Sequence, residues 1–264
     1  MLIRLDKFLA DTGYGTRSTV KQLLKKSAVT VDGVQVKKAD IKIDTEKNVI
    51  SVNGKTVQYE EYEYYMMNKP AGVISAATDE REKTVVDLIS DKKRRDLFPV
   101  GRLDRDTVGL LLLTNDGNLA RRLLAPGKHV DKVYRVKVTG ILDEEDVKAF
   151  REGIDIGDEK LTMPADLRII SVNECPLISG DNSEADNGWI KTYNTDAEVT
   201  LREGRFHQVK RMFSERGHMV VYLKRLSMGK LKLDEGLEEG QYRRLTEEEL
   251  KSLTEKRIIK SDNI

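Results

Sequence analysis

The chain has 264 residues, enough for one large or two ordinary domains, and its 46 basic and 45 acidic residues give a net charge of +1. No apolar run approaches ~20 residues, and the charged N-terminus lacks the apolar block of a signal peptide. The composition therefore excludes a transmembrane segment and favours the cytoplasm. A single cysteine, Cys175, and three scattered histidines exclude an internal disulfide and argue against a metal cluster.

Charge varies along the chain even though the total is close to zero. Residues 1–38 carry eight basic and three acidic residues, residues 202–232 carry nine and two, and residues 234–255 carry three and eight. The regional net charges are therefore +5, +7 and −5. Two basic regions beside an acidic one are typical of two contact surfaces for a polyanion, although ordinary charge variation produces the same pattern.

The first segment predicts a small mixed module. Residues 3–27 form two short helices by the spacing of their apolar residues, and Thr16 is the expected N-cap of the second. Asp-Gly in VTVDGVQV and Asn-Gly in VISVNGKTV then predict two hairpins. These elements predict a compact basic domain over residues 1–59.

Basic residues recur every four positions along the second predicted helix, with no acidic partner on that helix. This stripe favours phosphate contact over a merely solvated face. The stretch IRLDKFLADTGYGTRSTVKQLLKKSAVTVDGVQV resembles an S4 RNA-binding domain. The resemblance implies binding to structured RNA through its shape and phosphates. The residues expected to contact this RNA are Arg4, Lys7, Arg17, Lys21 and Lys25.

Residues 60–264 interleave strands and helices without regular βαβ spacing, which predicts an α+β domain with a mixed, mainly antiparallel sheet. Leu110–Leu113 predict a strand buried on both faces. Further strands are expected over residues 132–138, 165–171, 197–204 and 218–229. Helices are expected over residues 84–89, 118–125, 142–153, 205–217 and from the Thr246–Glu249 capping box onward.

Three acids cluster around the leucine-rich strand: Asp104, Asp106 and Asp116. They fit a metal site for phosphoryl transfer, a carboxylate pair for glycosidic chemistry, or a single nucleophilic aspartate supported by neighbouring arginines. Asp116 lies in an Asn-Asp-Gly turn, which is reason enough for an aspartate, and Asp106 precedes Thr107 in a position to hydrogen-bond the local backbone. Asp104 has no such simple structural role, so it is the strongest catalytic candidate.

The segment GRLDRDTVGLLLLTNDG resembles, over 17 consecutive residues, the signature motif of the RsuA/RluB group of rRNA pseudouridine synthases. MMNKPAGVIS, DKVYRVKV, EGRFHQVKRMF and LSMGKLKLDEGLEEGQYRRLTEEEL fit the same family, and the agreement is poorest around residues 173–194. The resemblance implies that Asp104 is the nucleophile and that Tyr134 packs beside the target base. It also implies that Arg205 pairs with the aspartate and that Leu201 lines the pocket. HQVKRM is closer to family members that act on small-subunit RNA.

The chemistry of such an enzyme sets further expectations. Pseudouridylation breaks the N1–C1′ bond of uridine, rotates the uracil and rejoins it through C5, so the resemblance implies neither a metal nor a cofactor. Asp104 either attacks C1′ or assists a deprotonation that gives a glycal, and both routes stay open. The uracil must not escape, so we expect a closed and partly apolar pocket. The uridine must also leave its stack, at a cost of a few kcal/mol.

Contacts with phosphates along a basic surface would offset that cost. The basic candidates are Arg102, Arg105, Lys210 and Arg211. His207 lies four residues before Arg211, on the same face if both are helical. His207 and Gln208 are either substrate contacts or a structural hydrogen-bonded pair. Asn68 and Lys69 are either substrate contacts, which we favour for the lysine, or residues of a solvated turn.

The leading hypothesis is a site-specific rRNA pseudouridine synthase, which we expect to be monomeric and to act on 16S rRNA or a small-subunit assembly intermediate. A synthase acting on 23S rRNA is one alternative. A non-catalytic RNA-binding or ribosome-assembly factor is a second, and a metal-dependent nuclease or phosphatase using Asp104 and Asp106 is a third.

Overall fold

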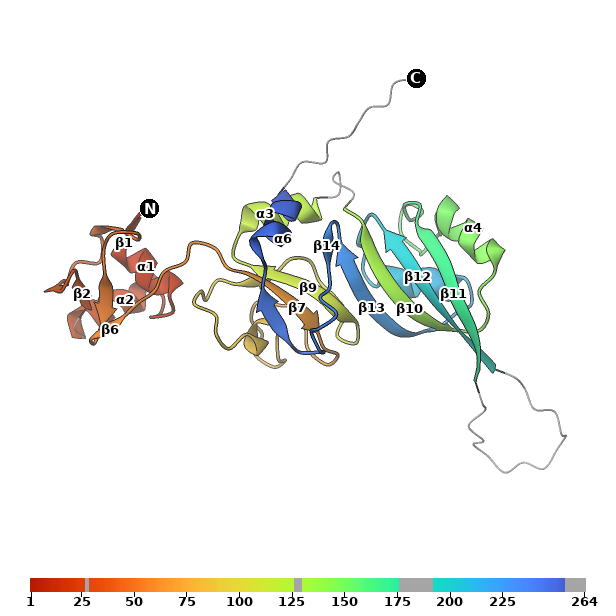
Figure 1. Cartoon of the computed structure of the whole chain (residues 1–264), viewed down its shortest axis with the longest axis horizontal. Coiled ribbons are helices and arrows are strands. Elements are labelled where there is room, and N and C mark those ends of the chain that lie inside the picture. The colour runs from red at the N-terminus through yellow and green to blue at the C-terminus, as the bar shows by residue number, and fades with distance from the viewer. Residues whose placement is uncertain (27–28, 126–129, 176–191, 255–264) are drawn as a thin grey trace, which may run out of the picture.

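The computed structural model describes residues 1–26, 29–125, 130–175 and 192–254. Its elements form a small N-terminal group and a larger group built on a nine-stranded sheet (Figure 1). The α+β class and the mixed, mainly antiparallel sheet are confirmed. No helix among these residues is both long and apolar enough to cross a bilayer. Most of the polar insert, residues 176–191, lies outside the described residues, as does His129.

The N-terminal group packs two helices and short strands around an apolar core. Its elements are β1 (Leu2–Arg4), α1 (Leu5–Asp11), α2 (Arg17–Lys26), β2 (Val29–Val31), β3 (Val34–Gln35), β4 (Lys42–Asp44), β5 (Ile50–Val52) and β6 (Lys55–Thr56). The buried side chains of the two helices include Leu5, Phe8, Leu9, Val20 and Leu24. Asp32, Gly33, Asn53 and Gly54 have positive φ between paired strands, which confirms both hairpins.

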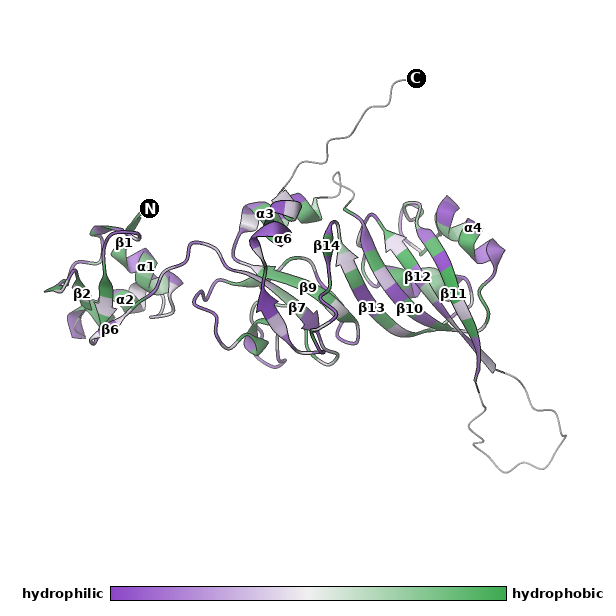
Figure 2. Cartoon of the chain, in the orientation of Figure 1, coloured by the Kyte–Doolittle hydropathy of each residue, from purple (hydrophilic) through white to green (hydrophobic). Residues whose placement is uncertain are grey.

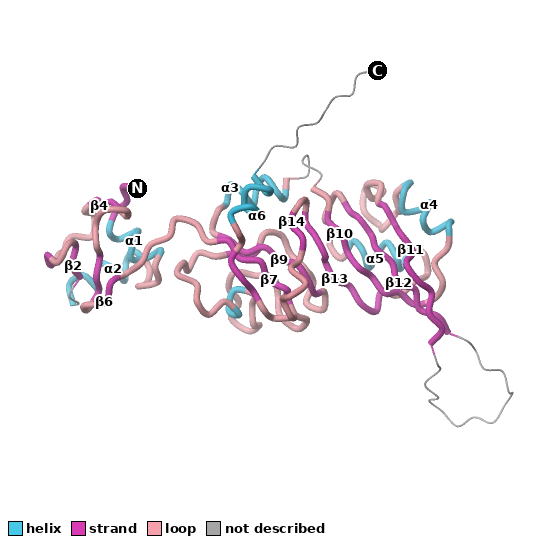
Figure 3. The backbone as a smooth tube through the Cα atoms, viewed as in Figure 1, coloured by secondary structure: helices cyan, strands magenta, loops and turns pink. Residues whose placement is uncertain are grey.

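The larger group is a long sheet with helices on its faces (Figure 3). Its first elements are β7 (Tyr64–Lys69), η1 (Val86–Leu88), β8 (Phe98–Pro99), β9 (Val108–Thr114), α3 (Gly117–Leu124), β10 (Lys132–Thr139) and α4 (Glu144–Glu152). The others are β11 (Asp166–Cys175), β12 (Thr192–Leu201), α5 (Gln208–Glu215), β13 (Val220–Met228), β14 (Leu231–Lys232), β15 (Tyr242–Arg244) and α6 (Glu247–Thr254). The strand order is β11-β12-β10-β13-β9-β7-β15, while β14 pairs with β13 and β8 with β9.

Strand β9 is covered on both faces, as its leucine run predicts. Leu111 and Leu113 join a core with Phe150 of α4 and Phe213 of α5. The alternate leucines of β9 join a second core, to which α3 and α6 contribute. Figure 2 shows β9 as largely hydrophobic, whereas α3 and α6 carry hydrophilic residues as well. Because β9 is packed between two apolar cores, it gives the loop that precedes it a rigid support.

The two halves of the sheet meet where β9 and β13 run parallel for only two residue pairs, Val108 with Lys224 and Gly109 with Arg225. Gly109 has φ +101, and a Cβ placed on it would lie 2.4 Å from the carbonyl oxygen of Arg225. Only glycine fits this backbone conformation and this close approach. Gly109 therefore sets how near the loop before β9 comes to the second half of the sheet.

Two predicted helices differ from the sequence pattern at their ends. The helix expected over residues 205–217 begins at Gln208, because His207 has φ 47, in the left-handed region, and acts as its N-cap. His207 and Arg211 therefore do not share a helix face, and that prediction is wrong. The helix expected over residues 84–89 is a single 3₁₀ turn at η1. The caps predicted at Thr16, Asp143 and the Thr246–Glu249 box are confirmed.

Candidate active site

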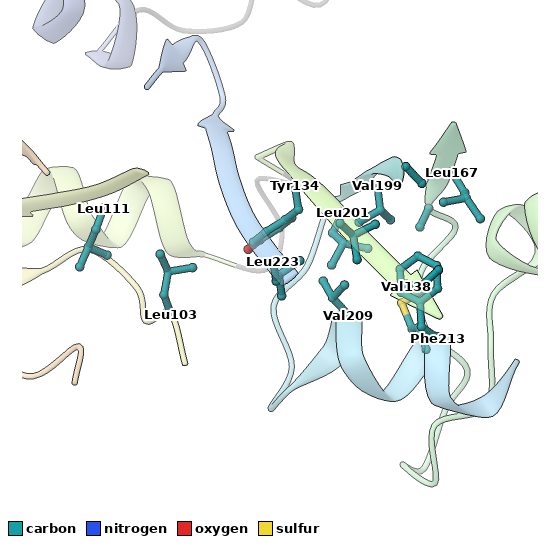
Figure 4. Close-up of a cluster of buried hydrophobic side chains, with 14 of the residues drawn as sticks. Leu103, Leu111, Tyr134, Val138, Leu167, Val199, Leu201, Val209, Phe213 and Leu223 are labelled. Atoms are coloured by element: carbon teal, nitrogen blue, oxygen red, sulfur yellow. The ribbon is translucent and has the colours of Figure 1, made fainter. Parts of the chain in front are cut away.

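A cavity of about 840 Å³ lies where the two halves of the sheet meet. Residues of β10, β12 and β13 line it, together with residues 202–210. Residues 101–107 (the Asp104 loop) also line it, except for Asp106. Figure 4 shows Tyr134, Leu201 and Leu223 from these three strands gathered opposite Val209 of α5. Tyr134 is 8% exposed and Leu201 is 2% exposed, so the cavity has an aromatic and aliphatic lining. This lining agrees with the partly apolar character that the chemistry predicts for the pocket, whose remaining lining is charged or polar.

The Asp104 loop lies against the end of β7 and the segment that follows it, residues 69–75. The Ser75 hydroxyl donates to the Leu103 carbonyl at 2.8 Å and accepts from the Leu103 amide at 3.0 Å. The Gly72 amide donates to the Arg105 carbonyl at 2.8 Å. These bonds hold the backbone on both sides of Asp104. The sequence pattern marked this segment only as a turn, and Ser75 was missed.

Ser75→Ala is expected to lower the free energy of unfolding by about 1–3 kcal/mol, because it leaves the buried amide and carbonyl of Leu103 without partners. Urea denaturation measures this loss. Ser214→Ala, at an exposed position of α5, is the matched control and should change stability by less than ~0.5 kcal/mol. Equal stabilities of the two variants would contradict the support role of Ser75.

Lys69 and Asn68 do not face the cavity, which corrects their assignment as substrate contacts. Lys69 is fully buried, and its ammonium donates to the carbonyls of Pro70, Arg105 and Thr107 at 2.9–3.3 Å. Burial lowers the pKa of Lys69 to about 8, against the attraction of Asp106 and Asp104. The Asn68 amide donates to the Leu237 carbonyl at 2.7 Å, and the residue is 2% exposed. Both side chains are support for neighbouring backbone rather than surfaces for RNA.

Asp104 contacts Lys210 and His207, and this arrangement corrects the expected pair with Arg205. Lys210 Nζ lies 3.2 Å from Asp104 Oδ2 and 2.5 Å from Asp106 Oδ1. His207 Nε2 lies 3.5 Å from Asp104 Oδ1. Burial acts to lower the pKa of Lys210, but its hydrogen bonds to the two aspartates outweigh burial and raise it. The hydrogen bond between Lys210 and Asp106 also lowers the pKa of Asp106. Lys210 therefore supplies the positive charge beside Asp104.

Arg205 and Arg211 are turned toward the loop that follows α4 instead. Arg205 donates to Glu203 at 3.0 Å, to Asp158 at 3.3 Å and to the carbonyls of residues 160 and 161 at 2.7 Å. Arg211 also pairs with Asp158, at 2.7 Å, and donates to the Ile156 carbonyl. Arg205 still lines the cavity, but its guanidinium is engaged away from Asp104. Arg211 is not among the residues that line the cavity, so the phosphate contact expected of it stays a prediction for the surface outside the cavity.

The other residues expected to contact the substrate differ in how exposed their side chains are. Arg102 and Arg105 are exposed at the cavity, and Arg105 also pairs with Glu82 at 3.1 Å. Gln208 is 4% exposed, accepts from the Arg205 amide and donates to Glu203, yet it also lines the cavity, so the substrate contact expected for it stays a prediction. These hydrogen bonds differ from the expected His207–Gln208 pair, which corrects that alternative.

The basic residues of the N-terminal group also divide into two sets. Arg17, Lys21 and Lys25 lie exposed along α2, and none of them forms an ion pair among the residues that the structure describes. Arg4 instead pairs with Asp6 at 2.8 Å, and Lys7 pairs with Asp11 at 2.5 Å.

Asp116 has the structural role that its turn predicts. It caps α3 by accepting from the amides of Asn118 and Leu119 at 3.0 Å. Within the described ranges, no three His, Cys, Asp or Glu side chains are grouped so as to hold a metal ion.

These features are those of an enzyme. A carboxylate with a cationic partner is held rigidly at a cavity with an aromatic and aliphatic lining, and the chain also carries a basic helical module. Residues 63–215 match the family model described as RNA pseudouridylate synthase, and residues 3–49 match the S4 domain. The chain belongs to the RNA pseudouridylate synthase family, whose members isomerise uridine to pseudouridine in RNA.

Relatives match over almost the whole chain. An uncharacterized RNA pseudouridine synthase of Bacillus subtilis, YtzG, is 45% identical, covering 96% of this chain and 99% of its own. Ribosomal small subunit pseudouridine synthase A of Vibrio cholerae is 37% identical (95% and 99% covered), and ribosomal large subunit pseudouridine synthase B of Bacillus subtilis is 38% identical (95% of each). A pseudouridylate synthase crystal structure superposes with a TM-score of 0.62 at 35% identity, covering 95% of this chain and 99% of that one.

Proposed function

We propose that this enzyme converts one uridine of 16S rRNA, free or in a small-subunit assembly intermediate, to pseudouridine in the cytoplasm and as a monomer. The observation that carries the enzyme assignment is Asp104, held by Lys210 at a cavity lined by Tyr134 and Leu201. HQVKRM, which resembles the small-subunit members, favours 16S over 23S rRNA. Relatives named for each subunit are about equally similar, so overall identity does not separate the two substrates.

The geometry of the site supports a different role in the reaction for each of these side chains. Asp104 acts on the ribose, by attack at C1′ or by assisting the glycal route, while Lys210 stabilises its charged form and orients it. The Tyr134 ring stacks on the uracil, and Leu201 closes the wall beside it. The electron pair of the broken bond stays on the uracil, which rotates within the cavity and forms the new bond through C5. No atom leaves the nucleotide in this sequence except the C5 proton, which is exchanged with solvent.

The experiment that tests this function is pseudouridine mapping of rRNA from cells with and without the gene. Loss of a single pseudouridine in 16S rRNA, restored by the wild-type protein and not by Asp104→Asn, supports the proposal. Loss of a pseudouridine in 23S rRNA instead would identify large-subunit rRNA as the substrate. An unchanged map of both rRNAs would favour the non-catalytic RNA-binding alternative.

We also propose that residues 1–59 form the RNA-binding domain and residues 60–264 the catalytic domain. Separate apolar clusters in the two parts support this division. The exposed α2 stripe then supplies phosphate contacts that hold the RNA without taking part in the reaction.

Replacement of Arg17, Lys21 and Lys25 together by glutamine should therefore weaken rRNA binding and reduce the slope of log affinity against log salt by about 2. Turnover at saturating RNA should not change. The double variant of Arg4 and Lys7 is the matched control, and its slope should fall less because Asp6 and Asp11 already pair with these residues. A triple variant with the wild-type salt slope would exclude the stripe as the contact surface.

A further inference from the structure

Phe206 is an exposed aromatic side chain at the cavity, and the reaction as described gives it no role. It is 68% exposed, more than any other aromatic residue in the described part of the chain, and it lines the cavity together with Asp104. Leu2 and Val34 are equally exposed but lie on the N-terminal group, away from this site. A single exposed apolar side chain is common on protein surfaces, so the case for a ligand rests on the place of this ring in the cavity that holds Asp104.

The ring is held in a defined place. It stacks on the imidazole of His207 with 3.8 Å between ring centroids and 18° between the planes. His207 has a left-handed backbone at φ 47, and its Nε2 lies 3.5 Å from Asp104 Oδ1. The Phe206 carbonyl accepts from Arg211 at 3.2 Å, which fixes the backbone on the other side. One face of the Phe206 ring is therefore covered by His207, and its high exposure leaves the other side open to a ligand.

The surroundings favour RNA as that ligand. Arg102 and Arg105 are exposed on the Asp104 loop and can contact phosphates on either side of the reacting nucleotide. A planar aromatic ring next to exposed guanidinium groups is the combination that holds unpaired nucleotides in RNA-binding proteins. When the target uridine swings into the cavity, the base beside it in the strand loses a stacking partner.

We propose that the open face of Phe206 stacks on the nucleobase adjacent to the target uridine and replaces the base that has moved into the cavity. The proposal rests on the uridine-isomerising activity of this family and adds a positioning residue to it. Stacking of this kind is worth a factor of about 10–100 in binding per base and does not depend on which base is present. Phe206 therefore stabilises the flipped state without touching the reacting atoms.

The test compares Phe206→Leu, Phe206→Tyr and the wild-type enzyme on a short RNA that carries the mapped uridine, labelled with tritium at C5 so that release of tritium reports turnover. Phe206→Leu should lower kcat/KM by about 10–100-fold, whereas Phe206→Tyr keeps the ring and should stay near wild type. Met219→Leu, exposed by 63% outside this cavity, is the matched control and should have no effect.

A second RNA, with an abasic site on each side of the same uridine, separates stacking from a structural role. The Phe206→Leu defect should largely disappear on this RNA, because the wild-type ring has no base to stack on. A defect of the same size on both RNAs would mean that Phe206 only holds His207, and would overturn the proposal. Wild-type turnover by Phe206→Leu on the first RNA would overturn it as well. Absence of turnover by the wild-type enzyme would instead contradict the proposed rRNA activity, and with it this role.

Discussion

Asp104→Asn is expected to reduce pseudouridine formation by more than ~10³-fold, the scale seen when a nucleophile is removed from an enzyme. The amide has nearly the same shape, but it is neutral and cannot act as a nucleophile or base at C1′. RNA affinity should change by less than ~threefold, because the α2 stripe and the exposed arginines remain. Tritium release from uridine labelled at C5 measures turnover, and filter binding measures affinity.

Asp106→Asn is the matched control for this prediction. Asp106 shares Lys210 with Asp104 but is 71% exposed in its side chain, so we expect its loss to reduce turnover by less than ~tenfold. If Asp104→Asn keeps more than ~10% of wild-type turnover, the carboxylate is not the reacting group. Equal large losses in both variants would point to a role shared by the two acids.

The second large effect is expected for Lys210→Met, which should lower kcat by about 10²–10³-fold with a smaller change in KM. Methionine keeps most of the side-chain volume but removes the charge that lies 3.2 Å from Asp104 Oδ2. Without this partner the Asp104 carboxylate loses both its orientation and its main cationic neighbour. Lys210→Arg should recover part of the rate because it restores the charge with different geometry.

Arg205→Met distinguishes this assignment from the pair that the sequence resemblance implied. Arg205 is engaged by Glu203, Asp158 and two carbonyls, so its replacement should act mainly on stability and on the cavity wall. Thermal denaturation should show a lower Tm, and kcat should fall less than in Lys210→Met. A Lys210→Met enzyme with the wild-type rate, together with a severe loss in Arg205→Met, would restore Arg205 as the partner of Asp104.

Local sequence patterns were sufficient for much of the fold. The strand at Leu110–Leu113, the hairpins at the Asp-Gly and Asn-Gly turns and the caps at Asp143 and Thr246 follow from interactions within a few residues. The motif around Asp104 also identified the residue that lies at the cavity, because its family signature is unbroken over 17 residues.

Contacts between distant segments could not be predicted in the same way. Lys69 and Asn68 read as an exposed turn, yet β7 lies between β9 and β15 and buries both residues. Ser75 carries no sequence signal, since its hydroxyl acts only because residues 69–75 pass beneath the Asp104 loop. Arg211 likewise meets Asp158 only because the loop after α4 lies beside the start of α5.

The sequence by itself determined the family, the identity of the acid at position 104 and the elements that support it, because these depend on short-range patterns and on side-chain chemistry. Only the tertiary structure decided which cation stands beside that acid. Lys210 and Arg205 are five residues apart in one basic segment, and composition cannot rank them. The left-handed turn at His207 starts α5 late, and it is Lys210 that reaches Asp104 while Asp158 and Glu203 hold Arg205 away. The direction of a side chain follows from the packing around it, which residue order alone does not contain.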